Sequence, residues 1–238
     1  MTINTKEFRE EGMKKLGVAN LRPQQEAPME AILDGKDVIV LMPTSGGKSL
    51  LYQLPAVMEP GCLTLVISPL ISLMKDQVAA LKSAGVPAAY INSSLTGEQI
   101  RTVYARTRKG AYKLIYVAPE RLETNSFLSL MQEMDVSFLA VDEAHCISQW
   151  GQDFRPSYLG IVDFINALPR RPIVAAYTAT ATKQVQSDIL RLLQLQSPYR
   201  IVTGFDRPNL YFDVRRPKNK FSALAALIDE RRERSGIV

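Results

Sequence analysis

Short apolar runs alternate with amphipathic segments along most of the 238-residue chain. The runs are apolar throughout and rich in β-branched residues, which is typical of parallel strands buried on both faces. They predict strands at 38–41, 63–67, 88–91, 114–117, 138–141 and 173–177. The segments between them repeat apolar residues every three or four positions and predict helices at 6–16, 26–33, 50–57, 70–84, 96–108, 127–134, 159–168 and 183–193. This alternation predicts an α/β fold, with a mostly parallel sheet and helices on both of its faces.

The pattern changes after Pro198. Residues 199–203 and 210–214 are predicted strands, 215–220 is a basic, proline-containing linker, and 221–234 is a predicted helix. One strand and one helix cannot bury a hydrophobic core by themselves. We therefore expect residues 1–208 to form one domain, and residues 209–238 to be a linker with the start of a second, incomplete α/β domain.

Composition places the chain among ordinary globular proteins. Hydrophobic residues make up 46% and charged residues 22%, and no apolar run reaches the length of a membrane span. The first residues include Lys6, Glu7 and Arg9, unlike a secretory signal. We expect a cytoplasmic protein, associated with the nucleoid in a bacterium, or a nuclear protein in a eukaryote. The net charge of +5 permits a polyanionic partner without requiring one.

The chain contains two cysteines, Cys62 and Cys146, and a single histidine, His145. This inventory cannot build a Cys/His zinc site and makes a disulfide framework improbable. A nucleophile–base pair of Cys146 and His145 is disfavoured, because neighbours in sequence seldom face each other productively. Both cysteines are expected to be small buried apolar residues.

The segment 42–49 has the features of a phosphate-binding loop. It follows an apolar run and leads through paired glycines into a helical segment. Lys48 would reach the terminal phosphates, and the Ser49 hydroxyl would coordinate Mg²⁺. Met42 stands where the strict pattern has its first glycine, so from this stretch alone a plain glycine-rich turn remains an alternative. The nucleotide-binding residues predicted here are Thr44, Ser45, Gly46, Gly47, Lys48 and Ser49.

A second candidate element is the acidic pair Asp142 and Glu143, directly after the predicted strand 138–141. An aspartate at the carboxyl end of a parallel strand, downstream of a phosphate loop, is placed to hold Mg²⁺, and the adjacent glutamate to polarise the attacking water. The alternative is a helix N-terminus with acidic residues in its first turn. That alternative does not explain the phosphate loop upstream in the same alternating pattern.

In these two elements the chain resembles the first RecA-like motor lobe of superfamily 2 helicases, and specifically the RecQ DNA helicase family. The resemblance implies a three-layer RecA-like P-loop NTPase fold, followed by a second RecA-like lobe that this chain only begins. It also accounts for Met42, because the phosphate loop of this superfamily commonly begins without the first glycine. The resemblance extends from about Phe8 to Val238 and is carried by the segments 22–25, 42–49, 68–77, 118–122, 142–145, 147–151, 153–156, 178–182 and 205–209.

The resemblance also implies an ATP·Mg²⁺ site. By position, Gln25 would read the adenine edge, with Arg22 packed beside the base, and His145 would join the catalytic set of Lys48, Asp142 and Glu143. The chain departs from the family at three positions, which are Val18 for an aromatic residue, Ser45 for a glycine and Gln152 for a histidine. The loss of stacking at position 18 predicts weaker ATP binding or weaker adenine preference.

The single tryptophan, Trp150, is followed within six residues by Phe154 and Arg155, in a stretch that contains Gly151 and Pro156. Such a loop is able to stack on bases and contact phosphate, whereas a buried Trp–Phe pair is the structural alternative. The resemblance identifies it as the aromatic-rich loop that couples single-stranded DNA to ATP hydrolysis. It also assigns DNA contact or coupling to other residues at or just beyond the strand ends, which are Ser68, Pro69, Lys75, Asn92, Ser93, Arg121, Gln149, Thr178 and Thr180. Thr182 is equally explained as a helix N-cap.

These inferences predict the motor lobe of an ATP-dependent 3′-to-5′ DNA helicase of recombination or repair. Its ligands would be ATP, Mg²⁺ and single-stranded or duplex-junction DNA. An RNA helicase or duplex translocase of the same superfamily, and a non-catalytic ATP-gated DNA-binding module, remain alternatives. In related motors the second lobe supplies an arginine finger in a Gln-x-x-Gly-Arg-x-x-Arg stretch, which this sequence lacks. We therefore expect the chain to bind nucleotide, to hydrolyse it poorly and not to unwind DNA.

Overall fold

The computed structural model describes residues 5–43, 46–58, 61–203 and 210–236. The chain divides into two units, residues 1–204 and 205–238, and each is described by itself. The predicted domain boundary between residues 208 and 209 and the predicted connection 205–209 lie outside the described residues.

The first unit is built on a sheet whose described strands are all parallel, in the order β3-β4-β2-β5-β6-β1-β7. Strand β1 lies between β6 and β7, and its Val40 pairs with Tyr177 on one side and Ile201 on the other. The predicted α/β fold is confirmed, and the predicted strand 199–203 is the β7 edge. The strands are β1 (Val38–Leu41), β2 (Leu63–Ile67), β3 (Ala88–Ile91), β4 (Leu114–Val117), β5 (Val136–Val141), β6 (Ile173–Thr178) and β7 (Tyr199–Val202).

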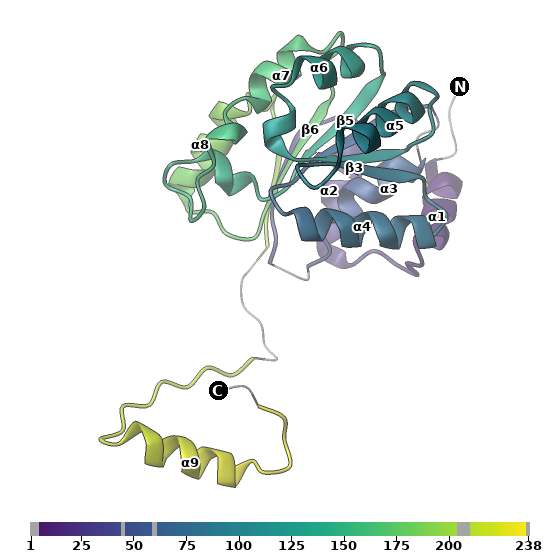
Figure 1. Cartoon of the computed structure of the whole chain (residues 1–238). Helices are drawn as coiled ribbons and strands as arrows, with labels where there is room; N and C mark the ends of the chain where they lie inside the picture. Colours follow the sequence, from purple (N-terminus) through teal and green to yellow (C-terminus); the bar gives the residue numbers. More distant parts are fainter. Residues whose placement is uncertain (1–4, 44–45, 59–60, 204–209, 237–238) are drawn as a thin grey trace. The chain divides into compact units, whose positions relative to one another are not determined.

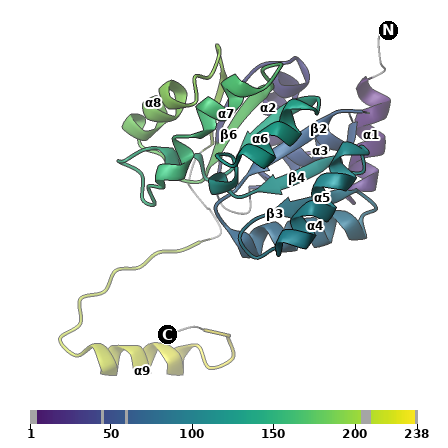
Figure 2. The same cartoon turned by 45° about the horizontal axis from the view of Figure 1, so that its top comes forward.

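Helices cover both faces of this sheet, as the apolar strands require (Figure 1, Figure 2). Successive residues of a strand point to opposite faces, so Val38 and Val40 pack on one side of β1, and Ile39 and Leu41 on the other. The first side carries α1 (Thr5–Lys15), α2 (Pro23–Leu33), α3 (Leu50–Met58) and α4 (Ile71–Ser83). The second side carries α5 (Gly97–Arg108), α6 (Asn125–Gln132), α7 (Ile161–Ala167) and α8 (Lys183–Leu192).

A buried carboxylate fastens the amino ends of the strands, away from the candidate site. Asp37, only 3% exposed, precedes β1 and pairs with Arg171 at 2.6 Å. It also accepts hydrogen bonds from the backbone N–H groups of Val174 (2.9 Å) and Gln196 (2.7 Å). One side chain therefore joins the starts of β1 and β6 to the turn before β7.

Helix α2 begins earlier than predicted. The sequence predicted a turn at 21–25 and a helix from residue 26, whereas the helix begins at Pro23. Proline has a helical φ and needs no N–H partner in the first turn, so it is favoured there. Arg22 is the N-cap, with extended backbone (φ −74°, ψ 151°), and Gln25 lies in the first turn.

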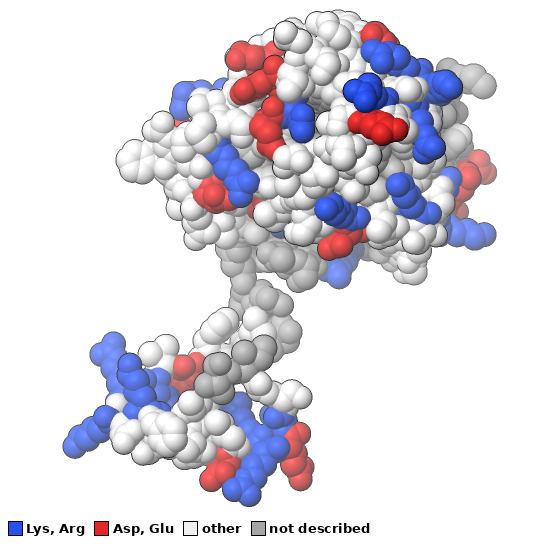
Figure 3. Space-filling model, in the orientation of Figure 1, with Lys and Arg blue, Asp and Glu red and all other residues white. Residues whose placement is uncertain are grey.

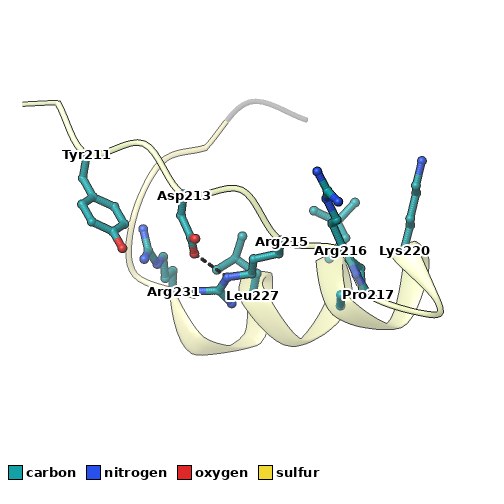
Figure 4. A pocket seen from close by; sticks show the side chains of 10 residues that line it. Tyr211, Asp213, Arg215, Arg216, Pro217, Lys220, Leu227 and Arg231 are labelled. Atoms are coloured by element: carbon teal, nitrogen blue, oxygen red, sulfur yellow. Dashed lines mark hydrogen bonds and ion pairs between the residues drawn. The ribbon is translucent and has the colours of Figure 1, made fainter.

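The predicted strand at 210–214 is wrong. These residues are described, and none of them is in a strand, because a strand requires a hydrogen-bonded neighbour and this segment has none. The second unit instead contains α9 (Lys220–Glu230), none of whose residues is buried. A groove of about 660 Å³ runs between α9 and residues 211–217, where Asp213 pairs with Arg215 at 2.6 Å (Figure 4).

Charge is distributed unevenly between the units. Residues 205–238 contain eight Lys and Arg against five Asp and Glu, so they carry +3 of the net +5. Figure 3 shows basic and acidic side chains intermixed on the visible face of the first unit. The basic balance of the whole chain is therefore no argument for a polyanion site on the sheet unit. No helix in the described part of the chain is long and apolar enough to cross a membrane.

Candidate nucleotide and DNA sites

The predicted site residues gather at the carboxyl edge of the sheet. The phosphate loop follows β1, Asp142 follows β5, and Thr178 ends β6. These three strands are neighbours, in the order β5-β6-β1, and parallel strands present their carboxyl ends at one edge. Ser68, Asn92 and Ala118 follow β2, β3 and β4 at the same edge.

The phosphate loop is shaped by its two glycines and by Met42. A Cβ at Gly46 would lie 2.4 Å from Met42 Cγ and 2.9 Å from the Pro43 carbonyl oxygen, so a side chain there requires the loop to shift. Gly47 has φ +88°, a left-handed conformation that favours glycine. Met42 itself is fully buried in the core, which explains why a large apolar side chain begins this loop. Thr44 and Ser45 lie outside the described residues.

Lys48 and Ser49 lie directly before α3, at the amino end of the helix that follows the phosphate loop. Lys48 Nζ donates to the Met42 carbonyl oxygen at 2.9 Å, which holds the ammonium across the loop. This position directs its charge to Asp142 as well, because Lys48 is among the groups that lower the pKa of that carboxyl.

Gln25 connects α2 to the phosphate loop. Its side chain is 2% exposed, its Nε2 donates to the Gly47 carbonyl oxygen (2.9 Å), and its Oε1 accepts from the Arg22 N–H (2.8 Å). The amide therefore has a structural role at the loop. The predicted reading of adenine by Gln25 and Arg22 stays a prediction, and Val18 is half-buried nearby in sequence.

Asp142 is an unusually basic carboxylate. Burial, and after it the negative charge of Glu143, raise the pKa of Asp142 to about 6, while the Glu143 N–H, Lys48 and Ser68 act in the opposite direction. The Glu143 N–H donates to Asp142 Oδ1 at 3.0 Å. A cation at this position would remove the cost of burying the charge, and carboxylate and hydroxyl oxygens suit Mg²⁺. The described residues contain no group of three or more His, Cys, Asp or Glu side chains fit for a metal, so such an ion would need further oxygens from water or phosphate.

Glu143 is held in a strained backbone conformation, with φ 46° and ψ 45°. For a residue with a side chain this left-handed geometry costs energy and persists only where neighbours enforce it. The hydroxyl of buried Tyr158 donates to the Asp142 carbonyl oxygen at 2.9 Å, and so fixes the peptide that precedes Glu143. Tyr158 was missed by the sequence analysis, since an isolated tyrosine after a loop gives no signal of this contact.

His145 joins the acidic segment to the end of β6. Its Nδ1 lies 2.9 Å from Thr178 Oγ1 and 3.3 Å from Glu143 Oε2. Because the Thr178 hydroxyl donates to the Thr180 carbonyl oxygen (3.0 Å), it accepts from His145, which assigns the ring proton to Nδ1. The structure thus brings together the predicted residues Glu143, His145, Thr178 and Thr180.

The aromatic loop, residues 148–155, projects from the same edge. Trp150 is 74% exposed, so the alternative of a buried Trp–Phe pair is wrong. Gly151 permits the turn, because a Cβ there would lie 2.3 Å from the His145 carbonyl oxygen. Gln149 is exposed, and Phe154 is half-buried.

Arg155, the last residue of the aromatic loop, connects the loop to η2 (Ala144–Ile147) and to Pro69 after β2. Its N–H donates to the Cys146 carbonyl oxygen (2.9 Å), and its guanidinium donates to the Pro69 carbonyl oxygen (3.2 Å) and pairs with Asp153 (2.8 Å). The Asp153 pairing raises the pKa of Arg155, which keeps the guanidinium charged. The predicted residues Pro69 and Arg155, far apart in sequence, are therefore in contact.

The other predicted DNA-side residues differ in accessibility. Lys75 and Ser93 are exposed, whereas Ser68 and Asn92 are buried. Asn92 Oδ1 accepts from Ser94 Oγ (2.7 Å), and Arg121 donates to the Asn92 carbonyl oxygen (3.3 Å), so Asn92 shapes its own turn. Asn92 thus has a supporting position, whereas the buried Ser68 hydroxyl has no hydrogen-bond partner among the described residues.

The two cysteines also differ. Cys146 is buried as predicted, and burial raises the pKa of its thiol to about 12, which disfavours a nucleophilic role. The prediction for Cys62 is wrong, because this residue is half-exposed, with its Sγ 3.7 Å from Asp135 Oδ2. It directly precedes β2, at the amino end of that strand.

Comparison with protein families matches residues 22–188 to the DEAD/DEAH box helicases. The chain belongs to the DEAD/DEAH box helicase family. Within this family the chain is 45% identical to the ATP-dependent DNA helicase RecQ of Bacillus subtilis, over 93% of this chain and 38% of that protein. It is 46% identical to the RecQ of Pasteurella multocida, over 93% of this chain and 35% of that protein. It is 40% identical to the ATP-dependent helicase SGS1 of Saccharomyces cerevisiae, over 91% of this chain and 16% of that protein.

The resemblance to RecQ helicases is thereby confirmed for a DEAD/DEAH box chain that spans little more than a third of its bacterial relatives. Solved structures agree in fold. The helicase Lhr of Mycobacterium smegmatis, bound to ssDNA and AMP-PNP, has a TM-score of 0.66 at 19% identity, covering 83% of this chain and 27% of that one. A hypothetical ATP-dependent RNA helicase from Sulfolobus tokodaii has a TM-score of 0.61 at 18% identity, covering 84% and 57%. The predicted helicase motor fold is confirmed.

Proposed function

We propose that this chain is the ATP-binding motor lobe of an ATP-dependent 3′-to-5′ DNA helicase of the RecQ type, acting in recombination or repair. The observation that carries the proposal is that three neighbouring strands, β5, β6 and β1, place Asp142, Thr178 and Lys48 at one edge. The exposed Trp150 loop follows the same acidic segment. Nucleotide chemistry and a stacking surface are thus adjacent in one unit.

On the nucleotide side, Lys48 would bind the terminal phosphates, and Gly46 and Gly47 would direct backbone N–H groups to them. Ser49 and Asp142 would hold Mg²⁺, which supplies positive charge against the phosphate oxygens when bound. Glu143, whose carboxylate lies 3.3 Å from His145 Nδ1, would accept a proton from the attacking water. His145 would couple the position of the Glu143 carboxylate to Thr178, because its Nδ1 contacts both side chains.

On the DNA side, Trp150 would stack on a base, with Phe154, Gln149 and Arg155 beside it. DNA is favoured over RNA because the relatives at 45% and 46% identity are named DNA helicases. Lys75 and Arg121 would contact the backbone of the same strand.

We expect the 238 residues alone to bind nucleotide and to hydrolyse it slowly, since they lack a stretch of the Gln-x-x-Gly-Arg-x-x-Arg type. An arginine finger contributes about 10³- to 10⁵-fold in related motors. Whole-protein unwinding would require the second RecA-like lobe.

The proposal is tested by nucleotide titration. A fluorescent ATP analogue should bind the chain in Mg²⁺, and Lys48→Ala should weaken its binding at least about tenfold by removing a charged phosphate contact. Lys109→Ala is the matched control, because Lys109 is exposed at the end of α5. An unchanged affinity in Lys48→Ala would contradict the assignment of the phosphate loop.

Single-stranded DNA and RNA of equal length distinguish the alternatives. Stronger binding of DNA, together with slow ATP turnover, supports the proposal. Preference for RNA would favour an RNA helicase, and fast DNA-stimulated turnover would contradict the expected need for a second lobe. Nucleotide-gated DNA binding without turnover, even with the rest of the protein present, would favour the non-catalytic module.

A further inference from the structure

Ser148 is the buried first residue of the aromatic loop, directly after η2 (Ala144–Ile147). The residue is 0% exposed, and its hydroxyl makes two contacts of opposite sense. It donates to Asp188 Oδ2 at 2.7 Å and accepts from the Trp150 N–H at 3.2 Å. The Ser148 hydroxyl therefore links the Asp188 carboxylate on α8 to the backbone N–H of the exposed Trp150.

Asp188 is suited to this contact. The residue is 8% exposed on the side of α8 that faces η2, and its second oxygen pairs with Arg191 at 3.0 Å. Ser148, and after it Arg191, hold the pKa of Asp188 below its usual range, so the acceptor is a carboxylate at neutral pH. An O–H···O⁻ bond of 2.7 Å has the length of a charge-assisted hydrogen bond, which is stronger than a neutral one.

The remainder of this interface is apolar. Cys146 and Ile147 of η2 pack in the same core cluster as Val185 and Ile189 of α8. Apolar contacts hold the two elements together but do not determine the orientation of the loop beyond them. The directional hydrogen bond of the Ser148 hydroxyl adds to the backbone bond from the Gly151 N–H to the Ser148 carbonyl oxygen (2.9 Å) in orienting the loop.

Helix α8 also adjoins the nucleotide side. Its N-cap is Thr182, whose hydroxyl accepts from the Val185 N–H at 3.3 Å. The cap lies four residues beyond Thr178, the partner of His145. Helix α8 therefore begins next to the catalytic edge, and its Asp188, six residues after the N-cap, contacts the start of the aromatic loop.

We propose that Asp188 is a positioning residue for DNA recognition: through the Ser148 hydroxyl it fixes the backbone of Trp150, so that the exposed indole is presented to single-stranded DNA in one orientation. This inference rests on the proposed role of the aromatic loop in binding DNA. Asp188 does not contact the DNA, and Arg191 neutralises its outer oxygen. Loss of the carboxylate leaves Trp150 accessible but unfixed, which costs affinity because the loop must then be ordered on binding.

The experiment uses Trp150 as its own reporter, since it is the single tryptophan of the chain. The variants Ser148→Ala, Asp188→Ala and Asp188→Asn are compared with wild type and with Arg191→Ala. Arg191→Ala is the matched control, because it removes the other partner of Asp188 and leaves the Ser148 bond. Tryptophan emission anisotropy is measured without DNA, and affinity is measured with labelled oligo(dT) and with a fluorescent ATP analogue.

We expect Ser148→Ala and Asp188→Ala to lower Trp150 anisotropy and to weaken DNA binding about 2- to 10-fold, the range for having to order one side chain on binding. Asp188→Asn should have a smaller effect, because its amide oxygen still accepts from Ser148. Arg191→Ala should change DNA affinity less than twofold, and ATP affinity should stay constant throughout. The double variant Ser148→Ala/Asp188→Ala should be no weaker than either single variant.

Unchanged anisotropy in folded Ser148→Ala and Asp188→Ala, or additive losses in the double variant, would overturn the proposal. If anisotropy falls in the variants while wild-type Trp150 fluorescence does not respond to oligo(dT), Asp188 and Ser148 fix the Trp150 backbone as proposed. The proposed role of the loop in binding DNA would then be wrong. Hydrogen exchange of the Trp150 amide in wild type needs no variant. Protection of this N–H beside an exposed indole is expected, and rapid exchange would contradict the anchor even if the variants do not fold.

Discussion

Asp142 shows how a single buried residue balances function against stability. Its raised pKa of about 6 means that ionisation is costly in the folded chain. The sign follows from linkage: the unfolded carboxyl loses its proton at lower pH than the folded one, so stability falls as pH rises from about 4 to 6. Above that window the full cost is present.

We therefore predict that Asp142→Asn stabilises the chain at pH 7.5, by about 2–3 kcal/mol for a shift of this size. The gain should shrink toward zero at about pH 3, where the wild-type carboxyl is largely protonated in both states. Urea unfolding at several pH values measures it, with exposed Asp76→Asn as the control. A gain that is independent of pH would contradict the burial of this charge. Mg²⁺ with nucleotide should stabilise wild type more than the variant.

Gly151 is required by a backbone contact. Gly151→Ala places a methyl group 2.3 Å from the His145 carbonyl oxygen, so the loop must move. We expect a loss of about 1–3 kcal/mol in unfolding free energy, the range for forced overpacking. Gly236→Ala, which meets nothing within 4 Å, should be neutral. A stable Gly151→Ala chain with unchanged Trp150 fluorescence would contradict the tight turn.

Tyr158 provides a residue-scale prediction for the catalytic strand end. Tyr158→Phe removes the hydroxyl that donates to the buried Asp142 carbonyl oxygen. An unsatisfied buried acceptor costs about 1–3 kcal/mol. Denaturant unfolding should report that loss, while ATP affinity at Lys48 should change little. Tyr112→Phe, at a half-buried tyrosine near the opposite edge of the sheet, is the control.

At the residue scale, the sequence predicted the candidate catalytic side chains but not the residues whose hydrogen bonds position them. Lys48, Asp142 and Glu143 were found because their types and spacing are dictated by phosphate and Mg²⁺. Tyr158, Ser148 and Asp188 act through single contacts across 16 to 40 residues of sequence, and no local pattern encodes such a contact.

At the scale of elements, the strands were predicted most closely. Four of them, β1, β2, β3 and β4, match their predicted bounds, because a strand buried on both faces is apolar at every position. The start of α2 was missed because Pro23 was taken as a breaker when it serves as a first-turn residue. The segment 210–214 has the apolar and aromatic composition of a strand, but composition supplies no hydrogen-bonding neighbour.

The Asp37 junction yields a prediction at this scale. Arg171→Ala leaves a buried carboxylate without its charged partner and should cost about 3–5 kcal/mol. Arg170→Ala removes an exposed pair with Asp135 and should cost at most about 1 kcal/mol. Urea unfolding of the two neighbouring variants compares them directly. Equal losses would mean that the Asp37 pair contributes no more than a surface pair.

At the scale of the whole molecule, the hydrophobic core lies within the first unit. None of the residues of α9 is buried, and the core clusters end at residue 201. We predict that a chain of residues 1–203 keeps a Tm within about 3 °C of the 238-residue chain, since none of the described residues 210–236 is buried. Calorimetry tests it, and the truncated chain should bind nucleotide equally well. A large fall in Tm would show that residues 204–238 contribute to the core.

The position of β1 in the sheet has a consequence for biosynthesis. This strand leaves the ribosome early, yet its two neighbours are β6 and β7, which begin at Ile173 and Tyr199. Such long-range pairing is slow and exposes apolar segments before it is complete. The phosphate loop at the end of β1 therefore acquires its final support only after nearly all of the first unit has been synthesised. A nascent chain that stops before β7 would already contain Lys48 and Asp142, but one edge of β1 would still be unpaired and exposed to aggregation.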